Sequence, residues 1–240
     1  MGHVRRDTQD DAAALYRAAL RHQNARAGRR DMRRAFALMK QAADVGHVDA
    51  QLTVGSYYDY GIGTRRNPRH AFRWYERAAR AGHPDGQYNL GMCYAEGIGI
   101  RRDARAALSW IKRAAAAKLP AALHALGRAY RYGEGVRKNA KRGFGLELQA
   151  ARRGDPEAQF STGWCYSRGE GVAANPRQAL AWYSRAARQG LDDAQYNLGV
   201  YYEEGRGVRR NARTAAKHYA DAARQGHREA AKALARLRGR

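Results

Sequence analysis

Cysteine is scarce in this chain of 240 residues, which contains only Cys93 and Cys165. The two occupy the same position of a repeated unit, two units apart, so stacked helices spaced about 8–10 Å apart would separate them by roughly 20 Å. A disulfide bond needs Cα atoms within about 7 Å of each other. We therefore expect two free thiols, which suits a reducing compartment.

Long apolar runs are also missing. The first residues, Met1 to Asp7, lead into a polar, alanine-rich stretch without the apolar segment of a secretory signal. No run approaches the roughly 20 apolar residues that a helix needs to cross a bilayer. These absences predict a cytoplasmic protein without a membrane span.

Acidic residues are few: 22 Asp and Glu stand against 45 Lys and Arg, which gives a formal net charge of +23. Such an excess favours acidic partners, namely nucleic acid, an anionic surface or a negatively charged protein. A second explanation stays open, because the excess is mainly arginine in a chain rich in alanine. That composition is also typical of the coding bias of a GC-rich bacterial genome.

Catalytic and metal-binding motifs are absent as well. His47, His83 and His227 recur at one position of the repeat, directly after a glycine, which indicates residues at helix junctions and not ligands. Neither a His-x-x-x-His pair nor a cysteine pair provides metal-ligand spacing. The Gly-x-Gly pairs follow helices and not strands, so they indicate turns and not phosphate-binding loops. We expect neither an enzyme nor a cofactor or metal site.

What the chain does contain is a strict repeat. One glycine recurs every 36 residues, and two further glycines keep the same step behind it. A fixed period in this range is typical of stacked supersecondary units, which bind partners along an extended surface. The recurring glycines are Gly55, Gly91, Gly127, Gly163 and Gly199, with the pairs Gly61/Gly63, Gly97/Gly99, Gly133/Gly135, Gly169/Gly171 and Gly205/Gly207.

Each unit reads as two amphipathic helices. In the first unit, apolar residues at 50, 54 and 58 and again at 71, 74, 75 and 78 follow helical spacing. The sequence therefore predicts an all-α protein, an α/α superhelical solenoid of helix-turn-helix repeats, with a helix A and a helix B in each unit. Gly55 lies within helix A at a cost of about 1 kcal/mol relative to alanine, which predicts a close approach of helix B. Gly61 and Gly63 supply the turn between the two helices.

Helix starts carry their own signals. Asn or Asp recurs at the expected first position of helix B, where the side chain accepts hydrogen bonds from backbone amides of the first turn. Proline, which tolerates the first helical turn, follows at Pro68 and Pro176 and also begins helix A at Pro84, Pro120 and Pro156. The predicted caps of helix B are Asp31, Asn67, Asp103, Asn139, Asn175 and Asn211.

The pattern of each unit resembles the Sel1-like repeat family, which is related to tetratricopeptide arrays. The segments AQYNLG at Ala194 to Gly199 and GQYNLG at Gly86 to Gly91 carry the likeness best, and Lys118 and Gly143 are departures in the third unit. The resemblance implies an α/α solenoid that acts as an adaptor. We expect a degenerate N-terminal capping helix pair at 1–49, five repeats at 50–85, 86–121, 122–157, 158–193 and 194–229, and a C-terminal capping helix at 230–240.

One face of helix A is free of framework residues. Its positions lie opposite the core at helical spacing, and by resemblance to tetratricopeptide arrays this face lines the concave groove. Aromatic and arginine side chains there are typical of binding hot spots, although variable positions on a solvated face would look similar. We call these ten residues the groove set: Ser56, Tyr60, Met92, Glu96, Arg128, Tyr132, Trp164, Arg168, Val200 and Glu204.

A second set is basic and lies around the start of helix B. Stacked units would place its clusters about 10 Å apart, close to one Debye length, so an anionic chain would meet a continuous potential. The same charges would also keep the array soluble, and aromatic side chains do not interleave with them as stacking platforms would. We call these thirteen residues the basic stripe: Arg65, Arg66, Arg69, Arg101, Arg102, Arg105, Arg137, Lys138, Lys141, Arg177, Arg209, Arg210 and Arg213.

Taken together, the sequence indicates a non-enzymatic scaffold or adaptor that binds a partner protein or peptide through the groove set. The alternative is a protein that binds an anionic polymer such as nucleic acid, or an acidic protein, through the basic stripe.

Overall fold

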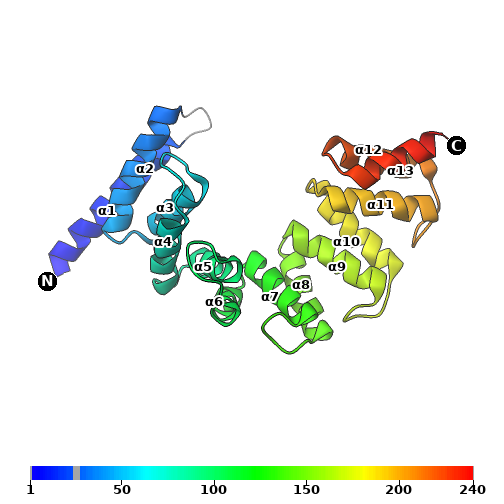
Figure 1. Cartoon of the computed structure of the whole chain (residues 1–240), viewed down its shortest axis with the longest axis horizontal. Coiled ribbons are helices and arrows are strands. Elements are labelled where there is room, and N and C mark those ends of the chain that lie inside the picture. The colour runs from blue at the N-terminus through cyan, green and yellow to red at the C-terminus, as the bar shows by residue number, and fades with distance from the viewer. Residues whose placement is uncertain (1, 24–27, 240) are drawn as a thin grey trace. The chain divides into compact units, whose positions relative to one another are not determined.

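The computed structural model of the chain describes residues 2–23 and 28–239; residues 1, 24–27 and 240 of the predicted caps lie outside the described residues. In the described part, thirteen α-helices form and no strand does (Figure 1). The helices are α1 (Gly2–His22), α2 (Arg29–Asp44), α3 (Val48–Tyr60), α4 (Pro68–Arg80), α5 (Pro84–Glu96), α6 (Ala104–Ala116), α7 (Pro120–Tyr132), α8 (Ala140–Arg152), α9 (Pro156–Arg168), α10 (Pro176–Arg188), α11 (Asp192–Glu204), α12 (Ala212–Arg224) and α13 (Arg228–Arg238).

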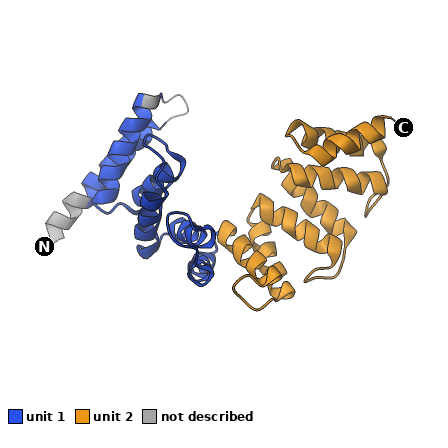
Figure 2. Ribbon diagram, viewed as in Figure 1, with its two compact units in different colours: residues 1–119 blue, residues 120–240 orange. Residues whose placement is uncertain are grey.

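The helices form two compact units. Unit 1 comprises residues 1–119 with α1 to α6, and unit 2 comprises residues 120–240 with α7 to α13 (Figure 2). Within each unit, every helix packs against the helix before it and the helix after it. Successive A helices begin 36 residues apart, at positions 48, 84, 120, 156 and 192. The predicted all-α solenoid with a 36-residue period is confirmed.

The glycine within helix A does allow a close approach of helix B. A Cβ atom at Gly163 would lie 2.8 Å from the ring of Tyr183 on α10, which is closer than carbon atoms pack. The second glycine of the turn pair is required for a different reason. Gly171 has φ +73°, and a Cβ there would collide with the carbonyl of Ala140 at the start of α8. Its turn therefore rests directly on the preceding repeat.

Five of the six predicted caps of helix B are confirmed, at positions 67, 103, 139, 175 and 211. The sixth is wrong. Helix α2 begins at Arg29 with Gly28 in extended backbone as its N-cap, so Asp31 lies inside the first turn. Because Gly28 starts this helix three residues earlier than predicted, Asp31 lies past the capping position. All five prolines stand at the first residue of their helices, as expected.

The recurring histidines begin the A helices. The Nδ1 atoms of His47, His83 and His227 each accept a hydrogen bond from a backbone amide three residues on, at 3.4, 3.4 and 3.1 Å. Their assignment to helix junctions is thus confirmed, with capping as the physical reason.

The recurring glutamine ties helix A to the preceding helix B in four repeats, at α3, α5, α9 and α11. In unit 1, Nε2 of Gln51 donates to the carbonyl of Ala43 at 3.3 Å. In unit 2, Nε2 of Gln159 donates to the carbonyl of Ala151 at 3.2 Å. This bond holds successive repeats in register, which explains why glutamine recurs beside the buried alanine.

Two departures of the third repeat concern glycine positions. Lys118 adopts the left-handed conformation, with φ 61°, at a position that is glycine in the neighbouring repeats. Gly143 faces Gly127 across the helix pair, and a Cβ at Gly143 would lie 2.7 Å from the carbonyl oxygen of Gly127. Helices α7 and α8 therefore meet almost backbone to backbone.

None of the helices in the described part of the chain is both long enough and apolar enough to cross a membrane.

Candidate functional site

In unit 1, four members of the groove set surround one hollow. Ser56 and Tyr60 lie at the C-terminal half of α3, and Met92 and Glu96 at the same half of α5. The hollow has a volume of about 330 Å³. Its lining includes the buried Tyr75 of α4. The structure thus gathers all groove-set residues of this unit at a single depression.

In unit 2, the six other members lie on three A helices. Arg128 and Tyr132 of α7 and Arg168 of α9 are exposed. Trp164 and Val200 are half-buried, because Trp164 packs against the core cluster around Tyr183 and Val200 against that around Tyr219. Glu204 is exposed and forms an ion pair with Arg206.

A residue outside the groove set connects two of its members. The guanidinium carbon of Arg131 lies 4.7 Å from the ring centroid of Tyr132 and 5.0 Å from that of Trp164. Cation–π attraction at these distances orders both aromatic side chains. Arg131 itself is only 4% exposed, so it supports the surface from below.

Arg131 belongs to a buried polar cluster that spans three helices. Its Nη2 lies 3.4 Å from Oε1 of Glu147 on α8, and its Nη1 lies 3.1 Å from Sγ of Cys165 on α9. The thiol in turn donates to Oε2 of Glu147 at 3.6 Å. Glu147 and Cys165 are fully buried. The cluster therefore fastens α7, α8 and α9 together through charge and hydrogen bonding.

The electrostatics of this cluster follow from burial. Burial raises the pKa of the Glu147 carboxyl to about 7, although Arg131 opposes the change. Burial, together with Glu147, raises the pKa of the Cys165 thiol to about 12. A thiol with such a pKa stays protonated at neutral pH and is a poor nucleophile. The cluster consequently stabilises the packing and offers no activated cysteine.

Sequence reasoning missed Arg131 and Glu147, although a signal was present. Glu147 stands in the repeat position that holds Tyr75, Tyr183 and Tyr219 elsewhere, and Arg131 stands where Glu203 does. In the last repeat the same two positions pair again, since the Tyr219 hydroxyl donates to Oε2 of Glu203 at 2.8 Å. A charged residue in an aromatic core position was the clue.

The C-terminal helix α13 is held to the array through Glu203, the residue at the same repeat position as Arg131. Nη2 of Arg236 on α13 donates to both carboxylate oxygens of Glu203, at 2.8 and 2.7 Å. Glu203 is largely buried, so this pair joins α13 to α11 where the repeats end.

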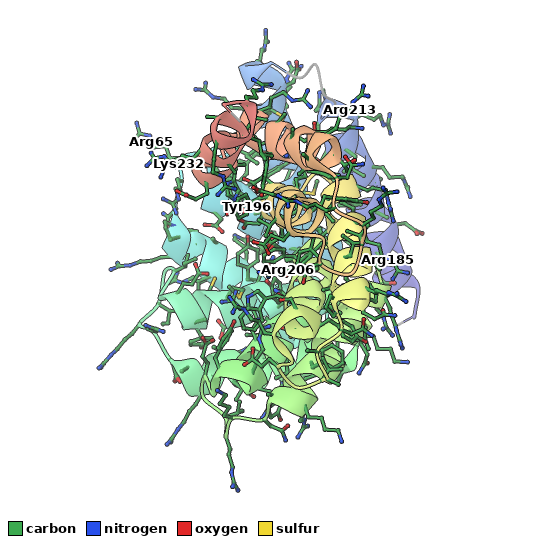
Figure 3. All side chains as sticks on the ribbon, turned by 90° about the vertical axis from the view of Figure 1, so that its right-hand side faces the viewer. Arg65, Arg185, Tyr196, Arg206, Arg213 and Lys232 are labelled. Carbon is green, nitrogen blue, oxygen red and sulfur yellow. The ribbon has the colours of Figure 1, made fainter. Side chains whose placement is uncertain are left out.

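All thirteen residues of the basic stripe are exposed. Arg65 and Arg213, for example, project from the ribbon of their own units (Figure 3). Among the described residues, no member of the stripe forms an ion pair with a carboxylate. Arg101, Arg102 and Arg105 are brought together around a hollow of about 630 Å³ next to Tyr94.

Within residues 2–23 and 28–239, no group of three or more His, Cys, Asp and Glu side chains is placed to hold a metal ion. The two cysteines are free, as expected, and both are buried.

Comparison with protein families matches the Sel1 repeat over six consecutive segments: 12–47, 48–83, 84–119, 120–155, 156–191 and 192–227. These segments begin two residues earlier than the predicted repeats. They also include the helix pair α1 and α2 as a repeat of its own. No curated protein is significantly similar to this chain.

Three solved structures illustrate the likeness. A protective antigen of uropathogenic Escherichia coli with an SLR fold is 30% identical with a TM-score of 0.80, over 94% of this chain and 48% of the antigen. The chain thus spans about half the length of that protein. A Sel1 repeat protein from Oxalobacter formigenes is 29% identical with a TM-score of 0.79, over 95% of this chain and 86% of the other. An immunity protein from Pseudomonas aeruginosa is 22% identical with a TM-score of 0.59, over 89% and 81%, and shares the fold alone.

Proposed function

Because this chain belongs to the Sel1 repeat family, we propose that it is a non-catalytic scaffold that binds a partner protein or peptide through its groove set. Sel1 repeat proteins are in general scaffolds for protein–protein interaction. In this chain, the groove set is the surface that contacts the partner. We place its action in the cytoplasm, where the two buried thiols stay reduced, and we assign the helix pair at 1–49 and the helix at 230–240 to the capping of the array.

The observation that carries the proposal is the hollow of unit 1. The repeat framework does not require Ser56, Tyr60, Met92 or Glu96, yet all four line the same depression. Tyr60 is 74% exposed, and a large aromatic side chain at the rim of a pocket is a common anchor for a partner.

Unit 2 supports the same interpretation by itself. Tyr132 and Trp164 are held by the buried Arg131, so their side chains lose little conformational freedom when a partner binds. Pre-ordered aromatic residues of this kind contribute more to affinity than mobile ones.

The full chain first captures its partner, which is then identified and purified for the binding test. Trp164→Ala, Arg128→Ala and Tyr60→Ala should each weaken binding in calorimetry, by about 2 kcal/mol for a hot spot, without a loss of helicity. Lys217→Ala, which changes an exposed residue of α12, is the matched control and should bind like the wild type. Binding that is unchanged in all three variants would contradict the proposal.

The basic stripe supports a second candidate function, the binding of nucleic acid or another anionic polymer. The specific observation is the hollow lined by Arg101, Arg102 and Arg105. Asp103 also lines this hollow, but its carboxylate accepts from backbone amides of α6 and pairs with none of the three arginines, so each arginine can contact a phosphate.

A salt titration tests this second function. Binding to unrelated DNA should weaken with salt, and the triple change to glutamine at positions 101, 102 and 105 should reduce the slope of log K against log salt by about 3. The matched control changes three exposed arginines elsewhere: Arg73, Arg152 and Arg188. Equal slopes for the two triple variants, or no binding at low salt, would rule out a phosphate site there.

A further inference from the structure

The hollow of unit 1 has an unusual charge for this protein. The chain carries 45 Lys and Arg against 22 Asp and Glu, yet the ten residues around the hollow include two carboxylates, Asp59 and Glu96, and no Lys, Arg or His. Among the described residues, neither carboxylate forms an ion pair. The lining of the depression therefore carries negative charge alone, and the nearby Arg66 donates to the backbone carbonyl of Asp59 at 2.8 Å and not to its carboxylate.

Three tyrosines add a second kind of attraction. Tyr60 stands at the rim and is 74% exposed, whereas Tyr75 forms the floor and is 3% exposed. Tyr88 lies on the wall that α5 provides. The faces of tyrosine rings attract cations, most strongly where water is partly excluded.

The buried groups of the hollow respond to its negative field. Burial raises the pKa of the Cys93 thiol to about 12, and Asp59 and Glu96 add to the change. Burial, and after it Asp59, also raises the pKa of Tyr75. Both groups are thus kept neutral, and the two carboxylates are left to attract a positive ligand.

The volume limits the size of that ligand. Sites for drug-sized molecules measure about 300–1,000 Å³. A hollow of about 330 Å³ lies at the lower end of this range, which suits a ligand of the size of a single long side chain. Arginine fits this environment best, because its planar guanidinium can stack on an aromatic ring while it donates to carboxylates. The amide side chain of Asn89 on the wall offers one more polar contact.

We propose that the hollow between α3 and α5 binds an arginine side chain of the partner, held by Asp59 and Glu96 and stacked on tyrosine. This inference rests on the proposed scaffold function and names the chemistry that unit 1 recognises: a segment of the partner that carries an arginine. It also assigns opposite tasks to two surfaces, since the basic stripe repels the same segment.

The experiment measures binding of small probes to the full chain by NMR. N-acetyl-arginine amide is the positive probe, and N-acetyl-citrulline amide has nearly the same shape without the charge. The arginine probe should shift the amide signals of Asp59, Tyr60, Asn89 and Glu96 in a saturable way, and the citrulline probe should not. N-acetyl-lysine amide should bind more weakly than the arginine probe.

Two variants locate the binding. The double variant Asp59→Asn, Glu96→Gln keeps the side-chain shapes and should raise the Kd of the arginine probe about ten-fold, as expected when two partly exposed charges are lost. The matched control Glu134→Gln removes an exposed carboxylate of unit 2 and should leave the Kd unchanged. Equal effects of both variants, tighter binding of lysine than of arginine, or equal binding of citrulline would overturn the proposal.

This experiment is separate from the test of the scaffold function. If the arginine probe does not bind but the changes at Trp164 and Arg128 still weaken capture of the partner, the arginine site is wrong and the scaffold function stands. If the probe binds but capture is indifferent to those changes, the arginine site stands and the wider binding surface is wrong.

Discussion

Two glycines of α8 should respond in opposite ways to the same substitution. Gly143 and Gly145 lie two residues apart in the interior of this helix (Ala140–Arg152). A methyl group at Gly143 would lie 2.7 Å from the carbonyl oxygen of Gly127 and 3.0 Å from the backbone nitrogen of Arg131, whereas a methyl group at Gly145 would meet nothing within 4 Å. Alanine is therefore excluded by α7 at one site and accepted at the other.

The magnitudes follow from two opposing contributions. Replacing glycine by alanine within a helix stabilises it by about 1 kcal/mol. Overpacking destabilises a protein by about 1–3 kcal/mol, and the upper end applies at Gly143 because the colliding atoms are backbone atoms that cannot rotate away. Gly145→Ala should thus raise the free energy of unfolding by about 1 kcal/mol, and Gly143→Ala should lower it by about 2 kcal/mol.

The assay is urea unfolding followed by circular dichroism, with the midpoint and the m-value compared between variants. A repeat array can unfold in parts, so amide hydrogen exchange of α7 and α8 reports the local effect. Gly143→Ala should speed exchange in both helices and Gly145→Ala should slow it. Equal stabilisation by the two substitutions would refute the close approach of α7 and α8 on which the reasoning depends.

Two further substitutions test the polar cluster and the backbone. The folded-state pKa of Glu147 is raised from 4.5 to about 7, so its contribution to stability is complete below about pH 4.5 and is lost as pH rises through about 7; the loss amounts to about 3 kcal/mol. The stability of the Glu147→Gln variant, measured as the urea midpoint, should therefore fall less between pH 5 and pH 8 than the stability of the wild type. Lys118→Gly should stabilise the protein by about 1 kcal/mol, because lysine is strained at φ 61°, whereas Lys112→Gly within α6 should destabilise it by a similar amount.

Parallel pH profiles for wild type and Glu147→Gln would show that this carboxyl does not titrate near neutral pH. A loss of stability in Lys118→Gly, measured by thermal and urea unfolding, would show that the lysine makes contacts that outweigh its strained backbone.

Much of the fold could be predicted from local patterns. Asn67 and Pro68 mark the start of a helix because their effects act within one turn, and Gly61 marks a turn because its left-handed backbone conformation is a local property. Asp31 shows the limit of such reasoning, since the same signal failed where Gly28 allowed the helix to begin earlier.

The binding surfaces were predictable only in part. The groove set followed from positions that the framework leaves free, and four of its residues do meet at one hollow. The negative charge of that hollow was not foreseen, because Asp59 reads as one more polar residue at the end of a helix. Likewise, Arg131 and Cys165 are 34 residues apart, and no local pattern connects them.

The amino-acid sequence by itself determined the helix pairs, their period and most of their caps, because these depend on contacts within a few residues that successive repeats make again. Tertiary structure decided which of the remaining side chains meet, which are buried and which charges stay unpaired. These properties depend on distances between helices, and a spacing along the chain cannot specify them.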